Sequence, residues 1–232
     1  YLKTNSSITA RVIQLLDGAY EQIDIAQFTW SVREIEAAVL WAHQRGVRVR
    51  IAMNESQGQG DTVSTRLKAA GVDVRFRAGR AVPSKGYSGL QHAKFMVVDR
   101  ATLLTGSNNW SSTGTSFNEE NTIVLRGQSN DAILTGFRCH FESIWNDRVD
   151  DAVRCSNSEA TFTPGTPAIK LLKEALRSAE NTVDVAMHHL LFGDLIKELA
   201  KCAERGVRVR VVLNLADQHE VKGSAWNRLL AA

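Results

Sequence analysis

The chain has 232 residues, of which 44% are hydrophobic, and it carries a net charge of +3 at pH 7. This size allows one large domain or two small ones with a well-buried core. No apolar run approaches the roughly twenty residues of a membrane-spanning helix, so we expect the chain as given to be soluble. It begins at Tyr1 rather than Met, which is compatible with a removed leader and leaves the compartment open.

Helical and strand patterns alternate from the start of the chain. Apolar residues recur three to four apart over 11–22, which predicts an amphipathic helix, and IDIAQF at 23–28 predicts a strand. A second amphipathic helix is predicted around 35–42, followed by a Gly stop and the strand of GVRVRIAMN at 46–54. We interpret the alternating arginines of GVRVR as a solvent-facing edge. Alternating helices and strands predict an α/β fold.

This unit of helix, strand, helix and strand occurs twice. AHQRGVRVRIAMN at 42–54 returns as CAERGVRVRVVLN at 202–214, and YEQIDIAQF at 20–28 matches ENTVDVAMH at 180–188 without a gap. The repeat predicts a tandem of α/β units, each with a mostly parallel or mixed sheet flanked by helices on both faces.

The predicted domain boundary lies between the two copies. Residues 1–158 form the first repeat, in which TRLKAAGVDVRFRAGR at 65–80 predicts a helix and a short strand before a polar stretch. Residues 159–232 begin the second repeat, which reaches SAWNRLLAA at 224–232, the counterpart of that helix, and stops. We therefore expect the chain to end inside a longer parent.

The polar stretch is QHAKFMVVDRATLLTGSNNW at 91–110, where polar groups interrupt an aliphatic segment. We predict a buried strand over 92–99, in which His92 and Lys94 share one face. Asp99 would then point away and support the site from behind. An imidazole beside an ammonium group suits an anion.

A second strand, ATLLT, leads into further polar groups. Gly106 allows a close approach of the backbone, and Ser107 and Asn109 supply neutral hydrogen-bonding groups. With few acids nearby, this set lacks the oxygen ligands of a hard divalent cation, so we expect no metal and no cofactor. It fits a phosphodiester, with Lys94 and Asn109 holding the non-bridging oxygens while His92 attacks phosphorus.

The segment NEENTIVL at 118–125 places Glu120 and Asn121 directly before another apolar strand. The Glu120 carboxylate could accept the far N–H of the His92 imidazole and so select its tautomer. The alternative is that Glu120 only precedes a strand.

The pattern H-x-K-x(4)-D-x(6)-G-S-x-N resembles the signature of the phospholipase D superfamily, and six residues match it: His92, Lys94, Asp99, Gly106, Ser107 and Asn109. The following N-x-E-N is similar to that of the nuclease-like branch. The resemblance covers nearly the whole chain, because the family fold is a tandem of such repeats. It implies metal-independent, two-step chemistry in which one histidine forms a phosphohistidine and a second protonates the leaving group and then activates water.

One motif supplies half of such a site. The second motif must come from residues beyond Ala232 or from the mate in a homodimer. Because the chain has already begun a second copy, we favour the missing C-terminal part over a dimer that pairs two His92 residues. Which histidine is the nucleophile stays open.

The segment 77–91, which leads into His92, is predicted to be a loop containing Gly, Pro and Ser. It could bind a polyanion through Arg77, Arg80 and Lys85, with Tyr87 stacking on a base. An ordinary surface loop explains them equally well. His188 and His189 resemble a metal pair without a third ligand, so we predict a structural or rim role.

The remaining cysteines and tryptophans are assigned to structure. Cys139 and Cys155 could form a disulfide in an oxidising compartment, which spacing alone does not decide. Cys202 is predicted to be a core residue, as are Trp110 and Trp145.

Three functions are compatible with these features. The first is a nuclease-like phosphodiesterase that acts on DNA or RNA. The second is a phospholipase D or transphosphatidylase that acts on phospholipids, which the polar character of the visible loops disfavours without excluding. The third is a catalytically inactive module that binds phosphodiesters.

Overall fold

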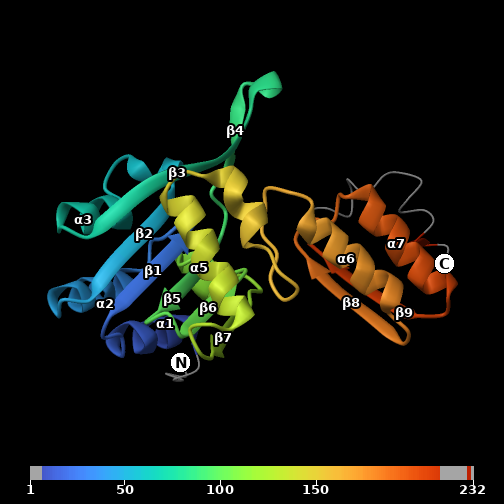
Figure 1. Ribbon diagram of the computed structural model, residues 1–232, viewed down its shortest axis with the longest axis horizontal. Helices are drawn as coiled ribbons and strands as arrows, with labels where there is room; N and C mark the ends of the chain where they lie inside the picture. The colour runs from blue at the N-terminus through green and yellow to red at the C-terminus, as the bar shows by residue number, and fades with distance from the viewer. Residues whose placement is uncertain (1–6, 215–228, 231–232) are drawn as a thin grey trace. The chain divides into compact units, whose positions relative to one another are not determined.

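The computed structural model describes residues 7–214 and 229–230 (Figure 1). The chain divides into two compact units, Tyr1–Gly165 and Thr166–Ala232, a few residues beyond the predicted boundary. Over the described ranges, every helix is too short or too polar to span a bilayer. The two units are described separately below.

Unit 1 is built on one seven-stranded sheet with the strand order β4-β3-β2-β1-β5-β6-β7. β1 pairs in parallel with β2, and β2 with β3, whereas the other neighbours pair antiparallel. The mixed sheet of the predicted α/β fold is therefore confirmed. The strands are β1 (Gln22–Gln27), β2 (Arg48–Asn54), β3 (Asp73–Val82), β4 (Tyr87–Leu90), β5 (Phe95–Val98), β6 (Thr102–Gly106) and β7 (Thr122–Arg126).

Helices cover both faces of this sheet, as predicted. One face packs against α1 (Ile8–Asp17), α2 (Arg33–Gln44) and α3 (Val63–Ala69) through the larger apolar cluster. The other face packs against α5 (Ala132–Trp145), which crosses the strands in Figure 1. The short helical segments are η1 (Glu55–Gly58), η2 (Pro83–Lys85), α4 (Ser112–Ser116) and η3 (Val149–Cys155).

The face under α5 contains a buried ion pair at the centre of the sheet. Arg50 Nε donates to Asp24 Oδ1 at 2.7 Å, and Arg50 Nη2 donates to Glu142 Oε1 on α5, also at 2.7 Å. The guanidinium lies 4.8 Å from the centroid of the Phe141 ring. Only 13% of the Arg50 side chain is exposed. The interpretation of GVRVR as a solvent-facing edge is therefore wrong for Arg50, because α5 covers this face of the sheet.

β5 is shorter than predicted. Its pairing with β1 runs from Ile23 opposite Val98 to Ala26 opposite Phe95, and it is a strand only over Phe95–Val98. His92 and Lys94 precede the strand, and Asp99 follows it with a φ of 48° in a tight turn. The strict alternation expected over 92–99 therefore does not extend to Asp99.

Asp99 instead holds the chain segment that leads into β1. Its carboxylate accepts hydrogen bonds from the backbone N–H groups of Tyr20, Glu21 and Gln22 at 3.2, 2.8 and 2.9 Å. These contacts lie at the end of β5 remote from His92. They agree with the supporting position proposed for Asp99, although the strand-face argument that led to it does not hold.

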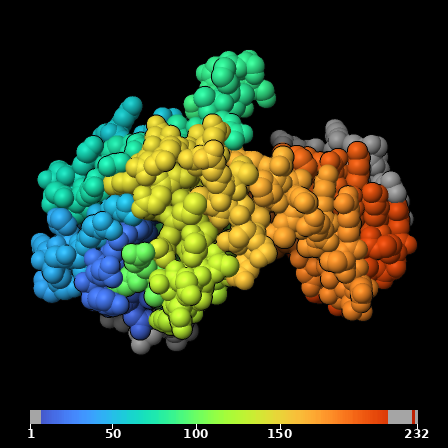
Figure 2. All heavy atoms as spheres, viewed as in Figure 1, coloured from blue at the N-terminus to red at the C-terminus, as the bar shows by residue number. Residues whose placement is uncertain are grey.

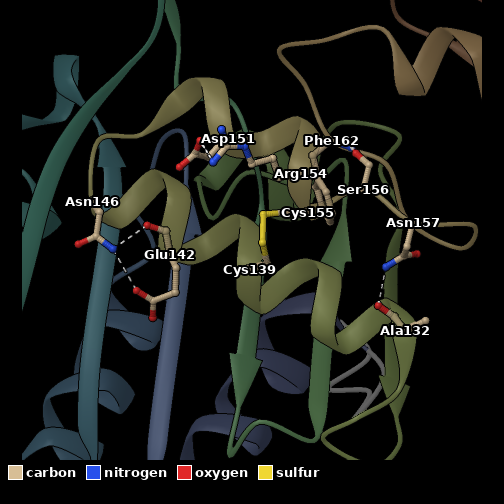
Figure 3. Close-up of a disulfide and its surroundings, with 10 residues drawn as sticks. All are labelled: Ala132, Cys139, Glu142, Asn146, Asp151, Arg154, Cys155, Ser156, Asn157 and Phe162. Atoms are coloured by element: carbon tan, nitrogen blue, oxygen red, sulfur yellow. Dashed lines mark hydrogen bonds and ion pairs between the residues drawn. A yellow bond between two sulfur atoms is a disulfide. The ribbon is translucent and has the colours of Figure 1, made fainter.

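Cys139 on α5 and Cys155 in η3 form a disulfide (Figure 3). The segment after α5 packs a small apolar cluster onto this helix through Ala152, Ala160 and Phe162. Asn157 Nδ2 also donates to Ala132 O at the start of α5, at 2.9 Å. The pairing that the sequence left open is thus present, and it holds the segment after α5 against the helix.

Unit 2 repeats the first half of unit 1. It contains α6 (Pro167–Ser178), β8 (Thr182–Met187), α7 (Gly193–Glu204) and β9 (Arg208–Leu213). β8 and β9 pair in parallel, in the register of β1 and β2 moved along by the repeat. The helix predicted in 224–232 lies outside the described residues except for positions 229–230, which are helical.

Substitution Asp99→Ala is expected to lower the free energy of unfolding of unit 1 by about 1–3 kcal/mol, because three backbone N–H groups lose a charged acceptor. Urea denaturation followed by circular dichroism measures this change. Asp17→Ala is the matched control, since Asp17 is an exposed acid in the last turn of α1. Equal stability of the two variants would contradict the supporting role of Asp99.

Removal of the disulfide in a Cys139→Ser/Cys155→Ser variant is expected to lower the free energy of unfolding by about 2–4 kcal/mol, because the unfolded chain regains the freedom of the closed loop. Urea denaturation with and without dithiothreitol measures it. The reductant should destabilise the wild type by a similar amount and leave the variant unchanged. A wild type that is indifferent to reductant would show that the bond makes no contribution.

Candidate active site

His92 and Lys94 lie together just ahead of β5. Lys94 Nζ is 3.2 Å from His92 Nδ1 and 3.3 Å from Nε2, and it donates to the backbone carbonyl of His92 at 2.8 Å. The two side chains therefore share one side of the chain, as predicted, although the segment is not a strand. The structure therefore brings these two sequence-predicted site residues into direct contact.

Phe28 completes the immediate surroundings of this pair. It follows the last residue of β1, and its ring centroid lies 4.6 Å from that of His92, tilted by 56°. Lys94 Nζ lies 5.4 Å from the same ring centroid, so the ammonium faces the π-system. Sequence reasoning missed Phe28. The available signal was its place at the carboxyl end of a predicted strand that must border the site.

The charge states of the pair follow from their burial. Burial lowers the pKa of His92, and the neighbouring Lys94 ammonium lowers it further. Burial also lowers the pKa of Lys94 to about 8, against the opposing effect of the Glu120 carboxylate. At pH 7 the imidazole is therefore mainly neutral and the amine mainly protonated. A neutral ring nitrogen beside a cation can attack a phosphorus atom whose oxygens the cation holds.

Gly106 and Ser107 join the end of β6 to the N-x-E-N segment. Ser107 donates from its backbone N–H to Asn121 O at 3.2 Å, and its Oγ accepts from Asn121 N at 3.1 Å. A Cβ on Gly106 would overlap the carbonyl of Asn121, so only glycine allows this approach.

Asn109 Oδ1 is buried and has no hydrogen-bond partner among the described residues, which leaves an unpaired acceptor in this part of the unit.

Glu120 acts on Lys94 and not, as the sequence suggested, on the His92 ring. Its Oε1 accepts from Asn118 Nδ2 at 3.2 Å, and its charge raises the pKa of Lys94. Within the described part of the chain, no hydrogen bond joins Glu120 to the His92 ring. The negative charge of Glu120 therefore favours the protonated form of Lys94.

The predicted loop at 77–91 is a hairpin of β3, η2 and β4 that projects from unit 1 in Figures 1 and 2. Arg77 donates to the backbone carbonyls of Ile144 and Trp145 at the end of α5, and Arg80 forms an ion pair with Asp150 at 2.6 Å. Both arginines are thus engaged in contacts within the unit. Lys85 and Tyr87 are exposed at the tip of the hairpin.

The tryptophans and the histidine pair singled out from the sequence lie outside the candidate site residues. Trp110 and Trp145 are buried, which confirms them as core residues. In unit 2, the ring centroids of His188 and His189 are 4.0 Å apart, and His188 Nε2 is 3.2 Å from Asn214 Nδ2. Across the described ranges, no group of three or more His, Cys, Asp or Glu side chains is placed to hold a metal ion.

The family model for the cardiolipin synthase, phospholipase D-like domain matches residues 12–145, more than half of the chain. The chain belongs to the phospholipase D-like family. A second model, for the N-terminal subdomain of the effector-binding domain of the transcriptional regulator TrmB, matches residues 165–226. The phospholipase D-like match contains all six motif residues of unit 1.

Relatives and solved structures agree with this assignment. A mitochondrial cardiolipin hydrolase from Xenopus tropicalis is 33% identical over 147 residues, which are 63% of this chain and 65% of that protein. The chain therefore spans less than two thirds of that phospholipase D-like relative.

Two solved structures share the fold. The phospholipase D family member Nuc from Salmonella typhimurium aligns with a TM-score of 0.52 and 24% identity, covering 62% of this chain and 90% of Nuc. Phosphatidylserine synthase from Haemophilus influenzae aligns with a TM-score of 0.66 and 12% identity, covering 88% of this chain and 59% of that protein. At these identities the likeness shows the phospholipase D-like fold alone.

Substitution Glu120→Gln is expected to lower the pKa of Lys94 further below about 8, because it removes the charge that opposes the effect of burial. An NMR titration of the lysine ε-carbon signals measures the shift. The control is Glu119→Gln, which removes the same charge from an exposed neighbour and should leave Lys94 unchanged. A Lys94 pKa that rises or stays constant in Glu120→Gln would refute the electrostatic effect of Glu120 on Lys94.

Proposed function

We propose that unit 1 supplies one half of the active site of a metal-independent phosphodiesterase. The observation that carries this proposal is the contact between the His92 imidazole and Lys94 Nζ, in a half-buried pair where burial favours the neutral ring. Lys94 and Asn109 bind the non-bridging oxygens of a phosphodiester, and His92 faces its phosphorus atom. Glu120 keeps Lys94 protonated, and Gly106, Ser107 and Asn121 hold the polar segments together.

The reaction proceeds in two steps with two imidazoles. One histidine forms a bond to phosphorus while the bond from phosphorus to the leaving oxygen breaks, and the other histidine gives that oxygen a proton. The second histidine then takes a proton from water, which attacks phosphorus and releases the first. His92 is one of the two. The other comes from a second copy of the motif, in a longer parent chain or in a second molecule of this one.

Nucleic acid is the proposed substrate. The N-x-E-N segment is similar to that of the nuclease-like branch, and the net charge of +3 suits a polyanion. Arg80 contributes less than expected because it is paired with Asp150, which leaves Lys85 and Tyr87 as the exposed binding residues of the hairpin.

A phospholipid is the second candidate substrate, and specific observations favour it. Phe117, beside the N-x-E-N segment, has 81% of its surface exposed, and Leu90, two residues before His92, has 57% exposed. Apolar side chains of this kind can enter a lipid surface. The relative that is 33% identical is named a cardiolipin hydrolase.

The full-length protein is expected to cleave labelled single-stranded DNA or RNA in the presence of EDTA, because no step of the proposed reaction uses a metal ion. Gel electrophoresis detects the products, and cardiolipin and phosphatidylcholine vesicles are tested in parallel for released phosphatidate. His92→Ala should reduce turnover on the order of 10³-fold or more.

Each outcome of this assay selects one function. Cleavage of lipid without cleavage of nucleic acid would replace the leading substrate with the second. Binding of either substrate without turnover would indicate an inactive module, and activity that EDTA abolishes would overturn the metal-independent mechanism. Asp17→Ala, remote from the motif in sequence, serves as the control for assay variation.

A further inference from the structure

The backbone that presents His92 lacks the support of a regular strand. The ladder between β5 and β1 begins at Phe95, so residues 91–94 have no regular sheet pairing of their own. A catalytic imidazole on an unsupported segment would sample many positions relative to Lys94, and such disorder is costly to a reaction that depends on alignment. Other contacts must therefore hold this segment in place.

The side chain of Gln91 provides such contacts. It is buried, with 5% of its surface exposed. Its Nε2 donates to two carbonyls at the carboxyl ends of the parallel strands, Ala52 O at 3.1 Å and Gln27 O at 3.3 Å. Its Oε1 accepts from the backbone N–H of Ala93 at 2.7 Å. The amide thus connects the ends of β1 and β2 to the peptide that follows His92.

Asn54, the last residue of β2, holds the other side of His92. Its Oδ1 accepts the backbone N–H of Gln91 at 3.1 Å, and it is almost completely buried, with 1% exposed. Its Nδ2 donates to Ser56 Oγ on the exposed side of the amide, at 2.7 Å. The backbone N–H groups on both sides of His92 are therefore bonded to buried side-chain amides.

We infer that Gln91 and Asn54 are positioning residues, which fix the backbone on both sides of His92 and thereby align its imidazole with Lys94. This inference rests on the proposed function of His92 for its catalytic meaning, whereas the alignment itself is a property of the folded chain. Neither amide contacts the reacting groups. Both act through the position of the peptide that carries the imidazole.

Gln91→Met keeps the length of the side chain and removes its donors and its acceptor. It is expected to increase amide hydrogen exchange at Ala93 about tenfold or more, because that N–H loses its partner. The NMR signals of the His92 ring should shift, with the pKa of His92 moving upward as the ring loses its fixed contact with Lys94. kcat should fall on the order of 10- to 100-fold with KM nearly unchanged.

Two variants of Asn54 and one of Ser56 supply the rescue test and the control. Asn54→Leu removes the acceptor for Gln91 N–H and should shift the His92 signals and kcat in the same direction as Gln91→Met. Asn54→Asp keeps an acceptor for Gln91 N–H and should retain low amide exchange at Gln91 and more of kcat than Asn54→Leu. Ser56→Ala removes only the outer partner of Asn54 and should leave both readouts unchanged.

The inference is overturned if Gln91→Met and Asn54→Leu lower the melting temperature but keep wild-type Ala93 exchange, His92 signals and kcat, because the amides would then only stabilise the fold. If Gln91→Met does not fold, the Asn54 variants decide the inference. Asn54→Leu should then increase amide exchange at Gln91 and shift the His92 signals, and wild-type values of both would count against the inference. A wild type without turnover would refute the proposed function, while the NMR measurements would still decide the positioning role.

Discussion

β5 runs antiparallel to β1 in the middle of the sheet, and the location of the candidate site depends on this pairing. Because the directions oppose, the start of β5 lies beside the end of β1. His92 therefore meets Phe28, and Gln91 reaches the carboxyl ends of both parallel strands. If β5 ran parallel to β1, the same residues would lie beside the start of β1, away from Phe28 and Asn54.

The same short strand is held at both ends by side chains that bond to backbone groups. Asp99 binds the N–H groups that lead into β1, and Gln91 binds the carbonyls where β1 and β2 end. With only four residues, β5 makes few hydrogen bonds to hold its position in the sheet. Asp99 and the Gln91 amide thus each bond to backbone groups at one end of β5, and these contacts oppose a shift of its register against β1.

The sequence was sufficient for features that depend on local pattern. The repeat and the helix periodicity predicted the α/β layers, and the H-x-K spacing predicted that His92 and Lys94 lie together. Features that depend on distant segments were not predictable. Arg50 is buried because α5, some ninety residues later, supplies Glu142 above it. Phe28 belongs to the site only because β5 pairs with β1, and the alternation argument failed at Asp99 because the strand ends at Val98.

The disulfide closes a covalent ring that contains the last two turns of α5, an exposed turn at 146–148 and η3. The match to the family model ends at residue 145, so this ring extends beyond the part of the chain that the family defines. A protease that cuts the exposed turn would open the backbone without separating the two pieces. The fragment after the cut would stay joined to α5 through sulfur, and only a reductant would detach it.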